Sequence, residues 1–224
     1  MMKKLSFFSS QSRILKDGEK KYVVKYYDTL MSIKWYFIVS AFKVYPFVSS
    51  PKERMKRELN FMTYNWKDKI FVPKIIDFDF EKFILYREYI DGRELKDQED
   101  YELLGSSLSV IHNNNFVLGD TKISNFLIDK YNKKKLYVID AEQSLQLDSP
   151  KYRSWDLLVL LFFIAVENIY DIKRFENISK VILDAYEPTP EIVKGIFDTK
   201  NTFLLSFFPV LHLESLRKII ARFL

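Results

Sequence analysis

Leu118-Gly-Asp-Thr-Lys-Ile-Ser-Asn-Phe-Leu-Ile128, followed by Leu136-Tyr-Val-Ile-Asp140, is the stretch of sequence that decides the expected fold. Two short apolar runs flank a lysine-rich turn, and this arrangement is typical of two paired strands. The turn is short, so we expect an antiparallel hairpin in which Phe126 pairs with Ile139. The polar residues of the stretch then gather where these two strands end.

The same register places Asn125 beside Asp140, just past the strand ends. An amide oxygen and a carboxylate that face one another are ligands that Mg²⁺ prefers. Asp120 and Lys122 lie on the loop that enters the hairpin, within reach of the same point. An acid that orients a hydroxyl and a lysine that neutralises phosphate charge are what phosphoryl transfer requires. Taken singly these are ordinary turn residues, and it is their combination that indicates a site.

The chain before this stretch predicts a sheet with one helix. Arg13–Leu15 and Lys21–Tyr27 flank the Asp17-Gly18 turn, which is a hairpin signal. Two further strands are expected over Val72–Phe80 and Lys82–Ile90. Residues 34–47 are aromatic and β-branched and also favour a strand.

The expected helix of this region begins at Ser50. Ser50 as the cap, Pro51 at the first helical position and Glu53 three residues after the cap predict a capping box. Met55 and Leu59 then fall on one face of the helix.

Helices are expected after the Asp91-Gly92 turn. Leu104, Leu108 and Ile111 share one face, and Trp155–Glu167 is apolar nearly all round, as in a helix at the centre of a core. The sequence therefore predicts an α+β fold. A sheet-rich lobe spans residues 1–90 and a helical lobe spans residues 91–224.

Composition excludes several classes of site. The 224 residues include no cysteine and two histidines, so disulfides, thiolate zinc sites and a cysteine nucleophile are ruled out. A metal must then bind oxygen ligands, which favours Mg²⁺. The net charge of +5 suits an anionic partner, although 30 acidic residues are interspersed with 35 basic ones. We expect the Lys130–Lys135 turn to be solvated, with contact to RNA or phosphate as the alternative.

No membrane partner is expected from the apolar runs. Ile33–Val48 is interrupted by Lys34 and Lys43, and Leu157–Val166 is only ten residues long. Both fall short of the roughly 18–20 apolar residues that a span needs. We therefore expect a soluble, cytoplasmic protein.

The Asp120-x-Lys122-x-x-Asn125 motif, the strand pair and Asp140 together resemble the catalytic loop and metal-binding aspartate of the protein-kinase-like superfamily. The resemblance extends over roughly residues 20–170 in the expected order. It is closest to the small atypical kinases, namely the RIO kinases and the small kinase/ATPase of the KEOPS complex. It implies a two-lobed protein-kinase-like fold with ATP and Mg²⁺ as cofactors.

The resemblance also implies roles for residues of the nucleotide site. Lys25 resembles the strand lysine that contacts the α- and β-phosphates, and Glu58 resembles the helix glutamate paired with it. Glu88 and Ile90 match the hinge segment whose backbone binds adenine.

For the reaction itself, the resemblance makes Asp120 the catalytic acid-base and Lys122 the contact to the γ-phosphate. Asn125 and Asp140 become the metal ligands. Asp156 resembles the buried aspartate that braces the catalytic loop.

The sequence departs from the superfamily at several positions. Leu118 stands where a histidine is usual, and Asp140-Ala-Glu142 replaces Asp-Phe-Gly. Glu142 either binds a second metal or pairs with a lysine. A glycine-rich loop is absent, so the serine-rich residues 9–12 are the segment expected to cover the phosphates.

Three functions are compatible with these residues. The first is an atypical serine/threonine protein kinase or kinase-like ATPase, which acts on a protein substrate or within a partner complex. The second is a small-molecule kinase of the aminoglycoside or choline type. The third is a nucleotide-binding pseudokinase scaffold. The intact set of Asp120, Lys122, Asn125 and Asp140 favours an enzyme.

Overall fold

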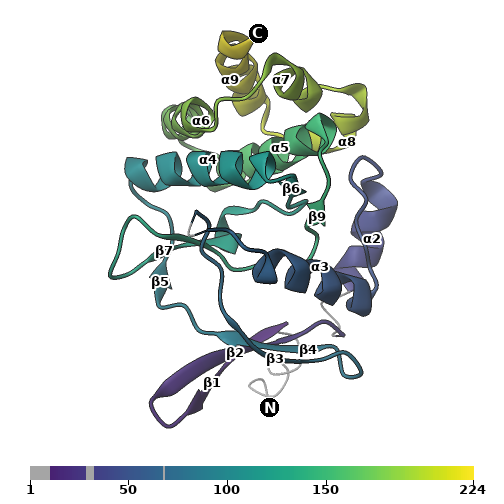
Figure 1. The fold of residues 1–224 in the computed structure, drawn as a ribbon. Helices are drawn as coiled ribbons and strands as arrows, with labels where there is room; N and C mark the ends of the chain where they lie inside the picture. The colour runs from purple at the N-terminus through teal and green to yellow at the C-terminus, as the bar shows by residue number, and fades with distance from the viewer. Residues whose placement is uncertain (1–10, 29–32, 68) are drawn as a thin grey trace, which may run out of the picture.

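A four-stranded antiparallel sheet forms the N-terminal part of the chain in the computed structural model, which describes residues 11–28, 33–67 and 69–224 (Figure 1). The strand order is β1-β2-β4-β3. Asp17 pairs with Lys20 at the tip of the first hairpin, where Gly18 has a φ of +58°, so the predicted Asp17-Gly18 hairpin is confirmed. The strands are β1 (Ser12–Asp17), β2 (Lys20–Tyr26), β3 (Ile75–Asp79) and β4 (Ile84–Glu88).

Helix α3 (Pro51–Thr63) begins where the sequence predicts, with Ser50 as the cap and proline at its start. The predicted capping box is wrong, because the Ser50 side chain makes no cap hydrogen bond. Glu53 instead pairs with Lys56 one turn along the exposed face of the helix, at 3.0 Å. Pro51 has no N–H and fixes its own φ, so it defines the start of the helix without that second bond.

Residues 33–41 form a helix, α2 (Ile33–Ala41), so the strand predicted over residues 34–47 is wrong. Propensity for strands is a weak guide when a segment is anchored by tertiary contacts. Trp35 supplies such an anchor, because its indole is buried and donates to the Glu142 carboxylate at 2.8 Å.

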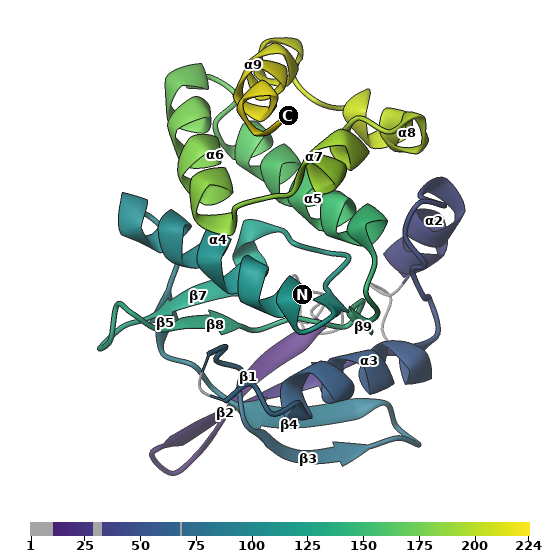
Figure 2. The ribbon, with the colours of Figure 1, turned by 45° about the horizontal axis from the view of Figure 1, so that its top comes forward.

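The C-terminal part of the chain is helical and encloses the main hydrophobic core (Figure 2). The longest helix, α5, carries the apolar run predicted to be central, and its residues from Trp155 to Leu161 are buried. Within the described residues, no helix is long and apolar enough to cross a membrane. The helices are α4 (Gln98–Asn113), α5 (Pro150–Glu167), α6 (Ile172–Tyr186), α7 (Pro190–Ile196), α8 (Thr202–Leu205) and α9 (Val210–Ile220).

Short strands connect the sheet to the helices. The antiparallel order β5-β7-β8 forms one small sheet, and β6 pairs with β9 in another. The fold is thus α+β, with an antiparallel sheet first and helices after it, as the sequence predicts. A boundary at residue 90 remains a prediction. The short strands are β5 (Gly92–Arg93), β6 (Phe116–Val117), β7 (Phe126–Asp129), β8 (Leu136–Val138) and β9 (Leu145–Gln146).

Candidate active site

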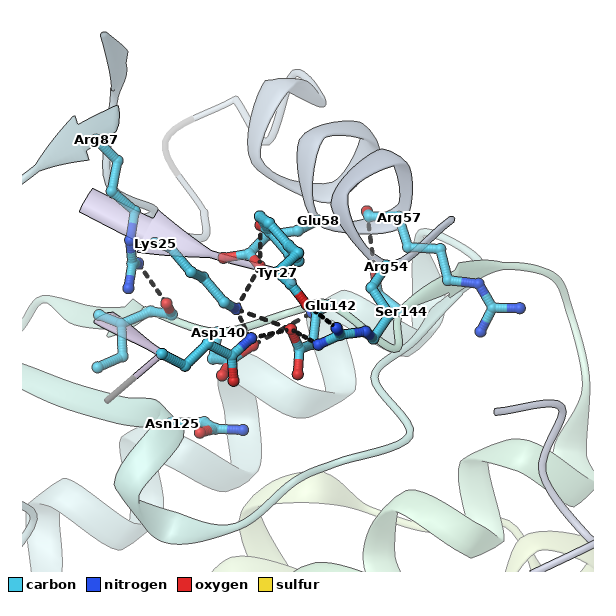
Figure 3. A network of polar contacts seen from close by, with 12 residues as sticks. Lys25, Tyr27, Arg54, Arg57, Glu58, Arg87, Asn125, Asp140, Glu142 and Ser144 are labelled. Carbon is cyan, nitrogen blue, oxygen red and sulfur yellow. Dashed lines mark hydrogen bonds and ion pairs between the residues drawn. The ribbon is translucent and has the colours of Figure 1, made fainter. Parts of the chain in front are cut away.

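The β7–β8 hairpin forms as expected, but its register differs by one residue from the prediction. Phe126 pairs with Val138, and the Ile139 N–H donates to the Asn125 carbonyl at 2.9 Å. The predicted pairing of Phe126 with Ile139 is therefore wrong. Asn125 and Asp140 still emerge from the same end of the hairpin, where they lie near one another (Figure 3).

The turn sets this register. The Asp129 N–H donates to the Lys135 carbonyl at 2.9 Å, so these two residues close the hairpin. The Asp129 carboxylate accepts from the N–H groups of Tyr131 and Asn132, at 2.8 and 2.7 Å. Residues 130–134 lie between Asp129 and Lys135, an odd number, whereas the predicted register required an even number of residues in the turn.

Asn125 and Asp140 line one cavity of about 360 Å³. The side-chain amide of Asn125 donates to the Asp120 carbonyl at 2.8 Å, which orients the amide and leaves Oδ1 as an acceptor. Oδ1 of Asp140 accepts from Lys25 at 2.9 Å, and in the part of the chain that the structure describes Oδ2 accepts no hydrogen bond. The donor set therefore fits a hard divalent cation.

Lys25 on β2 is the centre of the polar network in Figure 3. Its ammonium lies 2.5 Å from Glu58, 2.9 Å from Asp140 and 3.3 Å from Glu142. Burial alone would lower the pKa of Lys25, but the three carboxylates outweigh burial and raise it. The ion pair with Lys25 also affects Asp140. Burial opposes ionisation of Asp140, but Lys25 above all, helped by Lys122, holds the pKa of Asp140 well below its usual range. The Asp140 carboxylate is therefore ionised at neutral pH.

Glu58 reaches Lys25 from α3. Its Oε2 also accepts from the Tyr27 hydroxyl at 2.6 Å, and all three side chains are buried. Burial raises the pKa of Glu58, and Lys25 opposes that rise. The structure thus brings Lys25 and Glu58 together and adds Tyr27, which the sequence analysis did not consider.

Glu142 is buried and engaged on both carboxylate oxygens. Besides Lys25, it accepts from Arg54 at 3.1 Å, from Trp35 at 2.8 Å and from Gln11 at 2.6 Å. Glu58, Asp140 and Glu142 lie close enough together to share an ion. Their oxygens already face Lys25 and Arg54, so Glu142 is placed as the partner of basic groups.

Asp120 and Lys122 lie on the loop before β7 and pair with one another at 3.2 Å. Both side chains are partly exposed, at 20% and 27%. Desolvation raises the pKa of Asp120, with Lys122 opposing and the Asp140 charge reinforcing the rise. A carboxylate in this position can accept a proton from a hydroxyl that approaches from solvent.

Asp156 on α5 holds this loop from beneath. Its two oxygens accept from the N–H groups of Leu118 and Gly119, at 2.6 and 2.7 Å. The Thr121 hydroxyl also donates to the Asp156 carbonyl at 2.6 Å. One fully buried carboxylate therefore fixes the backbone that leads to Asp120.

His112, at the end of α4, completes the contacts of Asp156. One ring nitrogen lies 3.1 Å from the Asp156 carboxylate and the other 2.6 Å from the Tyr186 hydroxyl. Burial lowers the pKa of His112, although Asp156 partly offsets the effect and Arg153 adds to it.

The lowered pKa of His112 predicts a loss of stability in mild acid. The unfolded histidine binds a proton below its ordinary pKa of about 6.5, while the folded one resists protonation. The free energy of unfolding should fall as the pH drops below about 6.5, by up to about 1.4 kcal/mol per pH unit from this residue. Urea unfolding at pH 7.5, 6.5 and 5.5 measures the slope. His112→Gln should show a shallower slope, and equal slopes in both proteins would contradict the prediction.

Gly119 adopts a φ of +76°, so the chain turns between the backbone N–H groups bound by Asp156 and the next residue, Asp120. A Cβ at this position would overlap the ring of Tyr45. We expect Gly119→Ala to lose about 1–2 kcal/mol from the positive φ and a further 1–3 kcal/mol from overlap. Gly18→Ala is the matched control, since Gly18 has a φ of +58° and nothing within 4 Å. Equal losses in denaturant melts would show that the Tyr45 contact is not restrictive.

The segment that begins at the last residue of β4 lines the same cavity. Glu88 and Ile90, predicted as the hinge, both line it, together with Tyr89 between them. Val23 and Leu127 supply apolar walls. The predicted hinge residues and the predicted metal ligands thus line one cavity.

The serine-rich segment predicted to cover the phosphates is only partly described. Ser9 and Ser10 lie outside the described residues. Ser12 lines the cavity, while the Gln11 side chain is bonded to Glu142.

Two arginines of this site were missed. Arg54 is fully buried on α3 and donates to Glu142 and to the Tyr27 carbonyl. Arg87 on β4 is 6% exposed and donates to the Ile139 carbonyl. Arg54 precedes Glu58 by one helical turn, so the two share a face, and that spacing is a signal that could have identified it.

A comparison with protein-family models finds no match. A curated protein of Methanobrevibacter smithii, the probable bifunctional tRNA threonylcarbamoyladenosine biosynthesis protein, is 27% identical over 139 residues, or 60% of this chain. The match spans only a quarter of that relative, 25% of its length.

Two solved structures align with most of the chain. WaaP in complex with acyl carrier protein aligns with a TM-score of 0.50 and 12% identity, over 93% of this chain and 84% of that one. The choline kinase LicA from Streptococcus pneumoniae aligns with a TM-score of 0.46 and 14% identity, over 95% and 90%. The likeness to WaaP concerns the fold, which is protein-kinase-like, as the sequence predicts.

Proposed function

We propose that this chain is a phosphotransferase that binds Mg-ATP and transfers the γ-phosphate to a protein hydroxyl or to water. The observation that carries the proposal is the shared cavity, which Asn125 and Asp140 line together with the Glu88–Ile90 segment. The kinase-like fold supports a phosphotransferase in general terms. A protein acceptor, on serine or threonine, is the finer part of the proposal.

Each residue has a role in this reaction. Asn125 and Asp140 would hold the cation, which would neutralise charge on the phosphates when bound. Lys25, kept charged by its three carboxylates, faces the same point from β2 and is the group for the α- and β-phosphates. Glu58 keeps Lys25 in place from α3.

In the transfer step, an acceptor oxygen bonds to the γ-phosphorus while the bond from that phosphorus to the β–γ bridging oxygen breaks. The proton of the acceptor passes to the Asp120 carboxylate, and the displaced diphosphate oxygen carries the electron pair away with ADP. Lys122, 3.2 Å from Asp120, offsets negative charge that develops on the transferred group. Asp156 acts through the backbone of Leu118 and Gly119 and is a positioning residue.

The proposal is tested by binding and turnover measured on the same preparation. Mg-ATP at 100 times its dissociation constant should stabilise the protein by about 2.7 kcal/mol, read as a rise in melting temperature. ATP with EDTA should give a smaller rise, because EDTA removes the cation that Asn125 and Asp140 would hold. ADP release that depends on Mg²⁺ should accompany binding. Binding without any release would favour the pseudokinase scaffold, and absence of both with ATP and with GTP would contradict a nucleotide site.

A further inference from the structure

Arg87 is a buried cation in the wall of the cavity that Asn125 and Asp140 also line. Its side chain is 6% exposed. It lies on the same face of β4 as the buried Leu85, two residues before it, so it points inward from the sheet. In Figure 3 the guanidinium is directed toward the backbone beside Asp140. A charged group thus lies next to the point where the cation and the phosphates are proposed to bind.

The guanidinium has more donors than partners within the described residues. Its Nη1 donates to the Ile139 carbonyl, while its buried Nε has no hydrogen-bond partner. Across residues 11–28, 33–67 and 69–224, no carboxylate lies within ion-pair distance of Arg87. A bond to one carbonyl needs no full charge, and burying a cation without an anion is costly. This group therefore fits a ligand that brings both negative charge and acceptor oxygens.

The position of Arg87 selects which part of a nucleotide it would meet. Arg87 directly precedes Glu88, the first of the predicted hinge residues. Its hydrogen bond to Ile139 holds it beside Asp140, the next residue and a predicted metal ligand. In a nucleotide that reaches from the hinge segment to the cation, the α-phosphate lies between the nucleoside and the outer phosphates. The α-phosphate is therefore the part that we expect to lie nearest to Arg87.

Lys25 is the other buried cation of this region, and it differs from Arg87 in its partners. Lys25 already faces three carboxylates, at 2.5, 2.9 and 3.3 Å. Burial, together with the like charge of Arg87, acts to lower the pKa of Lys25, and the carboxylates outweigh both effects. A phosphate that enters between the two cations would relieve their repulsion. It gains more from Arg87, whose charge no carboxylate in the described part of the chain offsets by an ion pair.

The sequence gives a further reason for a cationic side chain at this point. Glycine most readily forms the backbone N–H cradles that hold phosphate groups, and the chain has no glycine before Gly18. A guanidinium offers the same kind of ligand a fixed pair of N–H donors, and arginine frequently binds phosphate through two parallel hydrogen bonds. With Nη1 on the Ile139 carbonyl, Nε and Nη2 remain as such a pair.

We propose that Arg87 binds the α-phosphate of the nucleotide, a step that rests on the proposed function. Nε and Nη2 donate to the non-bridging oxygens of that phosphate, and Nη1 stays on the Ile139 carbonyl. Arg87 is then a binding residue for the phosphate donor and takes no part in the proton transfer to Asp120.

Competition against a fluorescent ADP analogue tests this without turnover, by giving the affinities of the full chain for adenosine and for AMP. EDTA is present, so that no cation contributes. The wild type should bind AMP about 10- to 100-fold tighter than adenosine, the range expected for hydrogen bonds to a charged group. Arg87→Gln keeps an N–H donor for the Ile139 carbonyl but is neutral. In this variant AMP should lose most of its advantage, while adenosine binds as it does to the wild type.

Arg87→Lys and Arg57→Gln complete the set of variants. Arg87→Lys keeps the charge, so it should lose less of the AMP advantage than Arg87→Gln. Arg57→Gln is the matched control, because Arg57 on α3 also donates to backbone carbonyls, those of Pro46 and Gln143 at 3.0 and 3.3 Å. It should bind both ligands as the wild type does. Melting curves check that each variant folds, and the wild-type comparison of AMP with adenosine needs no variant.

Three results would overturn the inference. They are AMP that binds the wild type no tighter than adenosine, a folded Arg87→Gln that keeps the wild-type ratio of the two affinities, and Arg87→Lys that loses as much as Arg87→Gln. Any of these leaves the proposed phosphotransfer intact and reduces Arg87 to an anchor for Ile139. If the wild type binds neither the ADP analogue nor Mg-ATP, the proposed function itself fails, and this inference fails with it.

Discussion

Asp120→Asn is expected to lower ADP release by about 10²–10⁴-fold while nucleotide binding stays close to that of the wild type. Asparagine keeps the size of the side chain but cannot take the proton of the acceptor. Asp120 is partly exposed and its ion pair with Lys122 lies at the mouth of the site, so the fold should tolerate the change. Steady-state ADP release and Mg-ATP titration on one preparation give both quantities.

Asp140→Asn should differ from Asp120→Asn by losing binding as well as turnover. The ionised carboxylate would be the stronger of the two proposed cation ligands, and the substitution replaces it with a neutral amide oxygen. Lys25 keeps Glu58 and Glu142 as partners, so the network does not lose its only anion. The gain in melting temperature with Mg-ATP should shrink toward the gain with ATP and EDTA.

The matched control for both variants is Asp184→Asn. Asp184 lies on α6 and pairs with Arg222 at 3.3 Å on an exposed surface, where such a pair is worth about 0–1 kcal/mol. The Asp184→Asn variant should bind Mg-ATP and release ADP as the wild type does. Equal turnover in the wild type, Asp120→Asn and Asp140→Asn would show that the measured activity arises elsewhere.

Asp156→Ala is expected to have the largest effect on stability, about 3–5 kcal/mol. It leaves the N–H groups of Leu118 and Gly119 buried without acceptors and removes the carboxylate beside His112. A loss of this size is a large share of the roughly 5–15 kcal/mol by which proteins of this kind are stable. Urea unfolding monitored by tryptophan fluorescence measures it.

Asp171→Ala is the comparison for Asp156→Ala. Asp171 caps α6 by accepting from the Arg174 N–H in an exposed position, and such caps contribute about 1 kcal/mol. Asp156→Asn supplies the intermediate case, with one acceptor retained. If Asp156→Ala costs no more than Asp171→Ala, the loop is held by other contacts, such as the bond from Trp155 to the Gly119 carbonyl.

Short-range signals in the sequence predict much of the fold. The Asp17-Gly18 turn joins two short strands and so predicts a hairpin. Pro51 is tolerated at the start of a helix but not in its interior, so it marks where the helix begins. The central place of α5 follows from an apolar run with no polar face, although the helix begins at Pro150 and not at the predicted Trp155. These features depend on neighbours along the chain, and the sequence contains them in full.

The predictions were wrong where contacts between residues far apart in the chain determine the local structure. Helix α2 has the composition of a strand, and its buried tryptophan is held by Glu142, more than a hundred residues later. The β7–β8 register depends on which backbone groups the Asp129 carboxylate accepts. Alternation along β4 puts Leu85 and Arg87 on one face, but it does not say that this face lines a cavity.

The candidate site could be predicted from the sequence because its acidic and amide residues cluster within one short stretch. The motif orders Asp120, Lys122 and Asn125 along the loop, and the hairpin returns the chain to Asp140. The partners of Glu142 could not be found this way. Lys25, Trp35 and Arg54 come from three separate elements and meet only after folding.

The convergence of these side chains on Glu142 restricts how the sequence can evolve. A neutral residue at position 142 would remove the carboxylate that pairs with Arg54, and loss of Arg54 would leave Lys25 facing an excess of carboxylates. Drift at any one position therefore passes through a less fit intermediate. Descendants of a common ancestor should retain Trp35, Arg54 and Glu142 together or replace them as a set.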